Sequence, residues 1–299
     1  MDREEIDVEL AARLVAAQFP HWADLAVTPV EVGGWDNRTF RLGATMTVRL
    51  PTAQGYVAAV GKEHEWLPRL APRLPVAVPE PLGLGAPGCG YPWPWSVRRW
   101  IEGRPAAPGR IGDPVAFARD LATFLAALGG VDTAGGPLAG AHNFHRGGDL
   151  RVYDAETRAT IDALGARVDA GLALDTWEAA LDATWRGRPV WFHGDVAAGN
   201  LLVDGAGRLT GVIDFGTSGV GDPACDLVVC WTLLRGAARA AFREAVAADP
   251  AMWARGRGWA LWKALITLAA DAPSAAPDAG EHARVVREVL AEHRAAHGG

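Results

Sequence analysis

Residues 190–216, VWFHGDVAAGNLLVDGAGRLTGVIDFG, decide how the rest of the chain is interpreted. Two short apolar runs flank the turn-rich segment 204–208, a pattern typical of a β-hairpin. A hairpin would bring Asn200, at the start of one strand, beside Asp214, at the end of the next. Asp195 comes shortly before Asn200 in the same stretch. The stretch therefore predicts that two carboxylates and one amide gather at one place.

These are the residue types that phosphoryl transfer from a magnesium nucleotide needs. A carboxylate orients the attacking hydroxyl and accepts its proton, while oxygen ligands hold Mg²⁺ against the phosphates. A neutral amide oxygen with one carboxylate suits Mg²⁺, because phosphates and water complete its shell. A buried polar loop on an unrelated fold is the alternative, since His-x-Asp occurs by chance. The combined spacings favour a phosphotransferase.

The N-terminal part has the pattern of a small α+β unit with mostly antiparallel pairing. Ile6, Leu10 and Leu14 form the apolar stripe of a first helix. That helix is expected over 4–17, and three strands follow over 27–50. A helix over 62–74, kept short by Pro68 and Pro72, and two further strands up to about 101 complete the unit.

The chain beyond residue 112 is mainly helical. Asp113 and Pro114 are typical of a helix start, and Gly129 and Gly130 of its end. Further helices are expected over 155–172, 176–186, 223–248, 250–270 and 281–296. The division expected from these patterns is a first lobe over 1–101, a linker over 102–112 and a second lobe over 113–299.

Composition excludes several classes of protein. The 299 residues are 49% apolar, and 29 Lys and Arg against 35 Asp and Glu give a net charge of −6 without a basic run, which argues against nucleic-acid or membrane binding. Cys89, Cys225 and Cys230 form no CxxC, so neither a disulfide framework nor a zinc site is expected. With no apolar leader at the N-terminus, we expect a cytoplasmic protein. We also expect a monomer or a weak dimer.

The sequence resembles the aminoglycoside phosphotransferase family of the protein-kinase-like superfamily. The motifs that carry this resemblance are HGDVAAGN at 193–200 and IDFGTSGVGDPACD at 213–226. The resemblance implies a two-lobed kinase-like fold, in which the first lobe binds ATP or GTP and the second holds the catalytic loop 193–200, the metal loop 213–216 and the acceptor. It makes Asp195 the catalytic base, Asn200 and Asp214 the Mg²⁺ ligands, and His193 a structural brace.

The same resemblance gives Asp226 the task of anchoring the catalytic loop. The simpler alternative, a helix N-cap, is held equally.

In the first lobe the resemblance places a phosphate-covering loop at 32–37, where Gly33, Gly34 and Asn37 would face the nucleotide. It also places the adenine edge near Arg99 and Ile101.

The strand TMTVRL departs from the family pattern. Arg49 stands where a lysine is expected to bind the phosphates, with Glu63 as its partner. Three interpretations are open: Arg49 replaces the lysine, Lys62 reaches in from the helix, or nucleotide binding is weakened. The first is favoured.

The acceptor is expected to be a small hydroxylated molecule, because the short stretch after IDFG offers no platform for a protein substrate. The loop 140–149 carries the candidate substrate contacts Asn143 and Arg146, and simple packing through Phe144 is the alternative. An aminoglycoside or related antibiotic, and thus a role in antibiotic resistance, is one possibility. Others are a sugar, an amino alcohol or a nucleoside-like metabolite, or a non-catalytic nucleotide-binding module.

Overall fold

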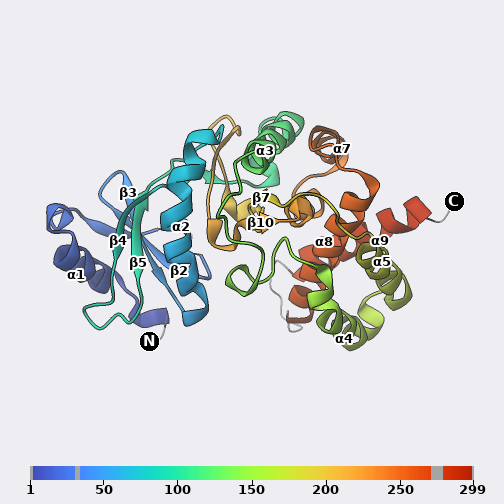
Figure 1. Ribbon diagram of the computed structural model, residues 1–299, viewed down its shortest axis with the longest axis horizontal. Coiled ribbons are helices and arrows are strands. Elements are labelled where there is room, and N and C mark those ends of the chain that lie inside the picture. The colour runs from blue at the N-terminus through green and yellow to red at the C-terminus, as the bar shows by residue number, and fades with distance from the viewer. Residues whose placement is uncertain (1–2, 31–33, 271–278, 298–299) are drawn as a thin grey trace. The chain divides into compact units, whose positions relative to one another are not determined.

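The computed structural model of the chain describes residues 3–30, 34–270 and 279–297. It divides into two compact units, Met1–Arg104 with Thr210–Gly216, and Pro105–Leu209 with Thr217–Gly299. The predicted α+β class, with an antiparallel sheet in the first unit and a mainly helical second unit, is confirmed (Figure 1).

The first unit is built on a five-stranded antiparallel sheet. Its strands follow the order β1 (Val27–Pro29), β2 (Asn37–Leu42), β3 (Met46–Pro51), β5 (Trp95–Arg99) and β4 (Pro81–Gly85).

Helices α1 (Val8–Gln18) and α2 (Val57–Leu70) cover opposite faces of this sheet (Figure 1). Successive residues of a strand point to opposite faces. Val97 accordingly packs in the core with Leu10 of α1, whereas Arg98 bonds to Glu63 of α2. The alternation in β5 thus decides which arginine is buried against α2.

Helix α2 differs from the expected one. It begins at Val57, earlier than predicted, and runs through Pro68 to Leu70. A proline removes one backbone hydrogen bond and crowds the preceding turn. At Pro68 this is tolerated because the helix ends within one turn of it.

The segment 210–216 belongs with the first unit, although we expected it in the second lobe. Ala77 forms a parallel bridge with Gly211, in which Ala77 N donates to Thr210 O at 3.1 Å and Val212 N donates to Ala77 O at 3.0 Å. These bonds fix the backbone that leads to Asp214.

The second unit is organised around helix α8 (Pro250–Ala270). Residues on all its sides are buried, as expected for a helix enclosed by others. Helices α5 (Ala170–Asp182) and α9 (Ala279–His297) pack against it, and α4 (Asp154–Leu164) touches it as well. The other helices are α3 (Pro114–Gly129), α6 (Val229–Thr232) and α7 (Gly236–Ala245).

Three of the expected helices are wrong in their bounds, and the one expected over 176–186 is α5, which starts at Ala170 and ends at Asp182. The predicted helix over 155–172 is interrupted because Gly165 has a φ of +50°, and α5 then starts after Asp169, whose carboxylate caps it. The predicted helix over 223–248 is split into a 3₁₀ segment, α6 and α7, with Gly236 at a φ of +50°.

The turn between strands β8 (Leu201–Val203) and β9 (Leu209–Val212) forms where predicted. Asp204 N donates to Arg208 O at 3.0 Å, and the Asp204 carboxylate accepts from the N–H groups of Ala206 and Arg208. The remaining strands are β6 (Arg104–Pro105) and the antiparallel pair β7 (Val190–Phe192) and β10 (Gly219–Gly221).

Candidate active site

The centre of the second unit's site is the Asp195 carboxylate, in the loop that follows β7. Its Oδ1 accepts a hydrogen bond from Lys263 Nζ at 2.5 Å, and its Oδ2 accepts one from Asn200 Nδ2 at 2.9 Å. Asn200 Nδ2 also donates to Asp195 O at 2.9 Å. Both oxygens of the carboxylate are therefore held in place.

The loop that carries Asp195 is anchored from the segment 223–228. The Asp226 carboxylate accepts the N–H of His193 at 2.9 Å and the N–H of Gly194 at 2.7 Å. The helix-capping role belongs instead to Asp222, which accepts the N–H of Ala224 at 3.1 Å. Asp226 thus fixes the backbone immediately before Asp195.

Gly194 is required at its position. Its φ is +84°, and a Cβ added there would lie 2.6 Å from Thr217 O. The buried ring of His193 braces the same turn, since its Nδ1 accepts the Asp195 N–H at 3.2 Å. The Gly in His-Gly-Asp is therefore needed by the backbone.

The charge state of Asp195 follows from its neighbours. Burial raises the pKa of its carboxyl, but the charge and hydrogen bond of Lys263, with the charges of His193 and Arg146, lower it by more. The net pKa is below the usual value for Asp. Asp195 is therefore ionised at neutral pH, the form that accepts a hydrogen bond from an alcohol.

The sequence reasoning missed Lys263 as a site residue. It lies on α8, far along the chain from the loop it contacts, and α8 is buried on all sides, so periodicity marks no special face. One signal was available: Lys62 and Lys263 are the only lysines in the sequence, and all other basic residues are arginines. Both lysines contact a loop that carries a catalytic motif.

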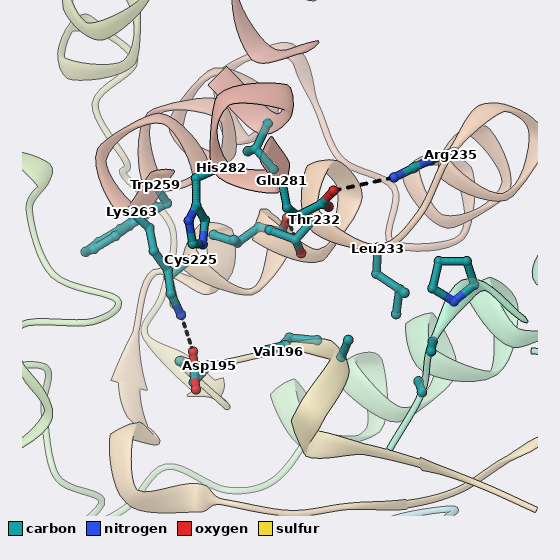
Figure 2. Close-up of a pocket in the computed structure, with 18 of the residues that line it drawn as sticks. Asp195, Val196, Cys225, Thr232, Leu233, Arg235, Trp259, Lys263, Glu281 and His282 are labelled. Atoms are coloured by element: carbon teal, nitrogen blue, oxygen red, sulfur yellow. Dashed lines mark hydrogen bonds and ion pairs between the residues drawn. The ribbon is translucent and has the colours of Figure 1, made fainter. Parts of the chain in front are cut away.

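A cavity of about 530 Å³ opens beside Asp195 within the second unit. Figure 2 shows Lys263 reaching Asp195 at one end and Arg235 paired with Glu281 at the other. Between them lie Val196 and Leu233. A volume of this size matches pockets that bind small organic molecules.

The two substrate candidates of loop 140–149 have different positions. Arg146 lines the cavity, and its guanidinium stacks on Trp262 with 4.4 Å between the guanidinium carbon and the ring centre. Asn143 is fully buried and is not part of the cavity wall. Its amide accepts from Gly140 N and donates to Arg146 O and Thr217 O, so it holds the loop together.

The first unit contains a buried ionic cluster around Glu63. Arg98 binds its two carboxylate oxygens at 2.7 and 2.8 Å, and Arg49 lies 3.6 Å from one of them. Burial raises the pKa of Glu63, but Arg98, Arg49 and Lys62 lower it by more, to about 2. The sequence predicted the pairing of Glu63 with Arg49 and missed Arg98, which makes the closer contact.

Arg49 and Lys62 both reach the metal loop. Arg49 donates to Asp214 Oδ1 at 2.9 Å, and Lys62 Nζ donates to Gly216 O at 2.7 Å. Burial lowers the pKa of Lys62 to about 8, although Glu63 and Asp214 oppose it. Asp214 itself has a φ of +67°, an unusual conformation for a residue other than glycine.

The expected phosphate loop is only partly described. Gly33 lies outside the described residues, and Asn37 opens strand β2. Arg3 donates to Gly34 O at 2.6 Å and to Trp35 O at 2.5 Å, which fixes the loop from the N-terminal side. Asp36 hydrogen bonds to Tyr56, whose pKa burial and this carboxylate raise.

Of the residues expected at the adenine edge, Arg99 is the last residue of β5 and Ile101 lies just beyond it. Arg99 is exposed and pairs with Glu80 at 3.5 Å, whereas Ile101 is buried. Because the side chains of neighbouring strand residues point to opposite faces of the sheet, Arg98 is buried and Arg99 is exposed.

Asn200 and Asp214, each in its own unit, have the chemistry of magnesium ligands. The amide nitrogen of Asn200 donates to Asp195, and within the described ranges its amide oxygen has no hydrogen bond. Asp214, in the first unit, offers a carboxylate whose Oδ1 accepts a hydrogen bond from Arg49. A neutral oxygen and a carboxylate fit Mg²⁺. In the part of the chain that the structure covers, no three His, Cys, Asp or Glu side chains form a metal-binding group.

The chain matches the model of the phosphotransferase enzyme family over residues 26–259. It is also 31% identical over 122 residues to the uncharacterized protein YcbJ of Bacillus subtilis (strain 168). That match covers 39% of this chain and only 38% of YcbJ. No helix among the described residues is both long and apolar enough to cross a membrane.

Solved structures share the fold along nearly the whole chain. The GDP complex of wild-type aminoglycoside 2'-phosphotransferase-IIIa is 18% identical, with a TM-score of 0.71, and 96% of this chain and 99% of that one are covered. The macrolide 2'-phosphotransferase MphH from Brachybacterium faecium is 25% identical, with a TM-score of 0.59 and 96% of both chains covered. These neighbours confirm the kinase-like fold expected from the sequence.

Proposed function

We propose, from the premise that this chain belongs to the phosphotransferase enzyme family, that it moves the γ-phosphoryl group of Mg-ATP or Mg-GTP to a hydroxyl of a small molecule. The observation that carries this proposal is the placement of Asp195. Its ionised carboxylate is held by Lys263 and Asn200 at the wall of a cavity large enough for a small acceptor.

Asp195 is the residue that orients the acceptor. Its carboxylate accepts the hydrogen bond of the attacking hydroxyl and takes the proton as the new P–O bond forms and the bond to the leaving diphosphate breaks. Because this transfer needs little covalent help, orientation is the larger part of the task. Asn200 and Lys263 limit the rotation of the carboxylate, and Asp226 limits the movement of its backbone.

The donor nucleotide is assigned to the first unit. The loop at 34–37, Arg49 and Lys62 supply backbone N–H groups and positive charge for its phosphates. Asn200 and Asp214 are the proposed ligands of Mg²⁺, which when bound neutralises phosphate charge. The Arg-for-Lys exchange at position 49 keeps the charge while adding a planar group that can bind two oxygens.

The test is an ADP- or GDP-release assay with purified protein, Mg-ATP or Mg-GTP, and a panel of hydroxylated compounds that includes antibiotics, sugars, amino alcohols and hydroxy acids. Asp195→Asn is the matched blank, because it keeps the size of the side chain and removes the charge. We expect product formation to fall about 10³-fold in this variant with nucleotide affinity unchanged. An equal rate in both proteins, or nucleotide binding without any transfer, would favour the non-catalytic module.

A further inference from the structure

The carboxylates that line the cavity beside Asp195 all have cationic partners, whereas one of its arginines has no carboxylate partner among the described residues. Of the described residues in its wall, the carboxylates are those of Asp195 and Glu281, and both are neutralised. Lys263 binds the first, and Arg284 and Arg235 pair with the second. Among the described residues of this wall, no carboxylate is left to receive a cationic acceptor.

Arg146 is in the opposite situation. Among the residues that the structure describes, no carboxylate forms an ion pair with its guanidinium, which is held only by stacking on Trp262 and Trp259. Its Nε is buried without a hydrogen-bond acceptor in the described part of the chain. A guanidinium in a cavity wall without a carboxylate partner among the described residues favours a ligand that brings an anionic group.

Trp259 supports Arg146 from below the cavity surface. Its side chain is 1% exposed and belongs to the cavity wall, yet its Nε1 finds no acceptor among the described residues. Among the described residues, Arg146 is therefore a guanidinium of the cavity wall that no carboxylate pairs with directly, although its charge acts on Asp195. The rest of the wall is largely apolar, with Val196, Leu233 and Val285 among its members.

We propose, resting on the function proposed above, that the acceptor is a hydroxy acid: a largely apolar molecule that carries a carboxylate or phosphate whose oxygens bind Arg146 while its hydroxyl faces Asp195. A polycation such as an aminoglycoside does not suit the described part of this wall, because its ammonium groups would find no carboxylate there that lacks a cationic partner. A phosphate of the donor nucleotide offers Arg146 the same chemistry, so the test separates the two sources.

The experiment measures binding to the full chain by calorimetry, without nucleotide. The probes are 3-phenyllactate, its methyl ester and phenylalaninol, which share a phenyl group and a hydroxyl and carry negative, zero and positive charge. Kanamycin serves as the polycation. We expect 3-phenyllactate to bind about tenfold more tightly than the ester, and the two cations not to bind.

Arg146→Met should remove the preference for the acid over the ester, and Arg146→Lys should keep part of it. Arg119→Met is the matched control, since it removes one exposed positive charge on α3 outside the cavity and should change nothing. Thermal unfolding and circular dichroism of each variant verify that it folds.

Three results would overturn the proposal. The first is equal or tighter binding of phenylalaninol or kanamycin, and the second is failure of all three phenyl probes to bind at millimolar concentration. The third is an Arg146→Met variant that loses affinity for ATP but not for 3-phenyllactate, which would assign Arg146 to the donor. Because these measurements need no phosphoryl transfer, the anion site and the proposed enzymatic activity can fail separately.

Discussion

The acidic residues of the two units are surrounded by different amounts of positive charge. In the first unit Glu63 and Asp214 share Arg98, Arg49 and Lys62. In the second unit Asp195 has a single ion-pair partner, Lys263, and an amide. Three cations close together suit a polyphosphate, although the charge of Asp36 also acts on Arg49, whereas a carboxylate with one ion-pair partner and one amide suits a neutral hydroxyl. This difference agrees with the proposal that the first unit binds the donor and the second the acceptor.

The largest effect is expected when the buried ion pair of Arg98 and Glu63 in the first unit is disrupted. Arg98→Met leaves the buried Glu63 carboxylate with more distant partners, and we expect a loss of about 3–5 kcal/mol in the free energy of unfolding at neutral pH. Urea denaturation measures this loss. The control is the double variant Arg98→Met with Glu63→Met, which should lose much less because no charge stays buried.

The same pair predicts a pH dependence with a definite sign. The folded pKa of Glu63 is about 2, below the usual value of 4.5, so its contribution to stability is present above 4.5 and is lost as pH falls toward 2. Wild type should therefore lose its advantage over the double variant across this range. A pH-independent difference between them would contradict the assignment.

Nucleotide affinity tests whether Arg49 of the first unit contacts the phosphates. Arg49→Met should weaken ADP binding by about tenfold or more, because a charge-assisted contact to phosphate is lost. Calorimetry with and without Mg²⁺ measures this change, and Arg49→Lys should restore most of the affinity. Unchanged affinity in Arg49→Met would transfer the phosphate contact to Lys62, the second interpretation that the sequence left open.

The second unit should respond through Asp195. In Lys263→Met the pKa of Asp195 rises, because the ammonium that lowers it is gone. The acid limb of the pH–rate profile then moves to higher pH, so the loss of kcat is largest in acid and shrinks as pH rises. Lys263→Arg keeps the charge and should keep the wild-type limb. A uniform loss at every pH would mean that Lys263 serves packing alone.

These two acidic sites also mark where sequence reasoning succeeds. The turn at 204–208 forms from the local chemistry of Asp204, and the order of the strands and helices followed from their apolar periodicity. Such features depend on neighbouring residues. They were sufficient for the fold class, which is confirmed, whereas the roles of the motif residues Asp195 and Asp214 stay predictions.

The partners that complete these sites depend on long-range packing. Lys263 reaches Asp195 from a helix that is buried all round, so no amphipathic stripe singles it out. Arg98, not Arg99, faces Glu63, and one residue of strand register decides between them. Asn143 is typical of a substrate contact by residue type, yet its amide is used up inside its own loop.

The smallest expected effect concerns the two lysines, one in each unit. With few primary amines in the chain, labelling by an amine-reactive reagent followed by mass spectrometry reports on Lys62 and Lys263 separately. Because burial lowers the pKa of Lys62 to about 8, its labelling should reach half its maximum near pH 8, without any change in activity or stability being required. Glu63→Gln removes a charge that opposes this shift and should move the midpoint lower still. A Lys62 midpoint near the usual 10.5 would mean that its ammonium is well solvated, and the surplus of buried cations in the first unit would then be smaller than the comparison assumes.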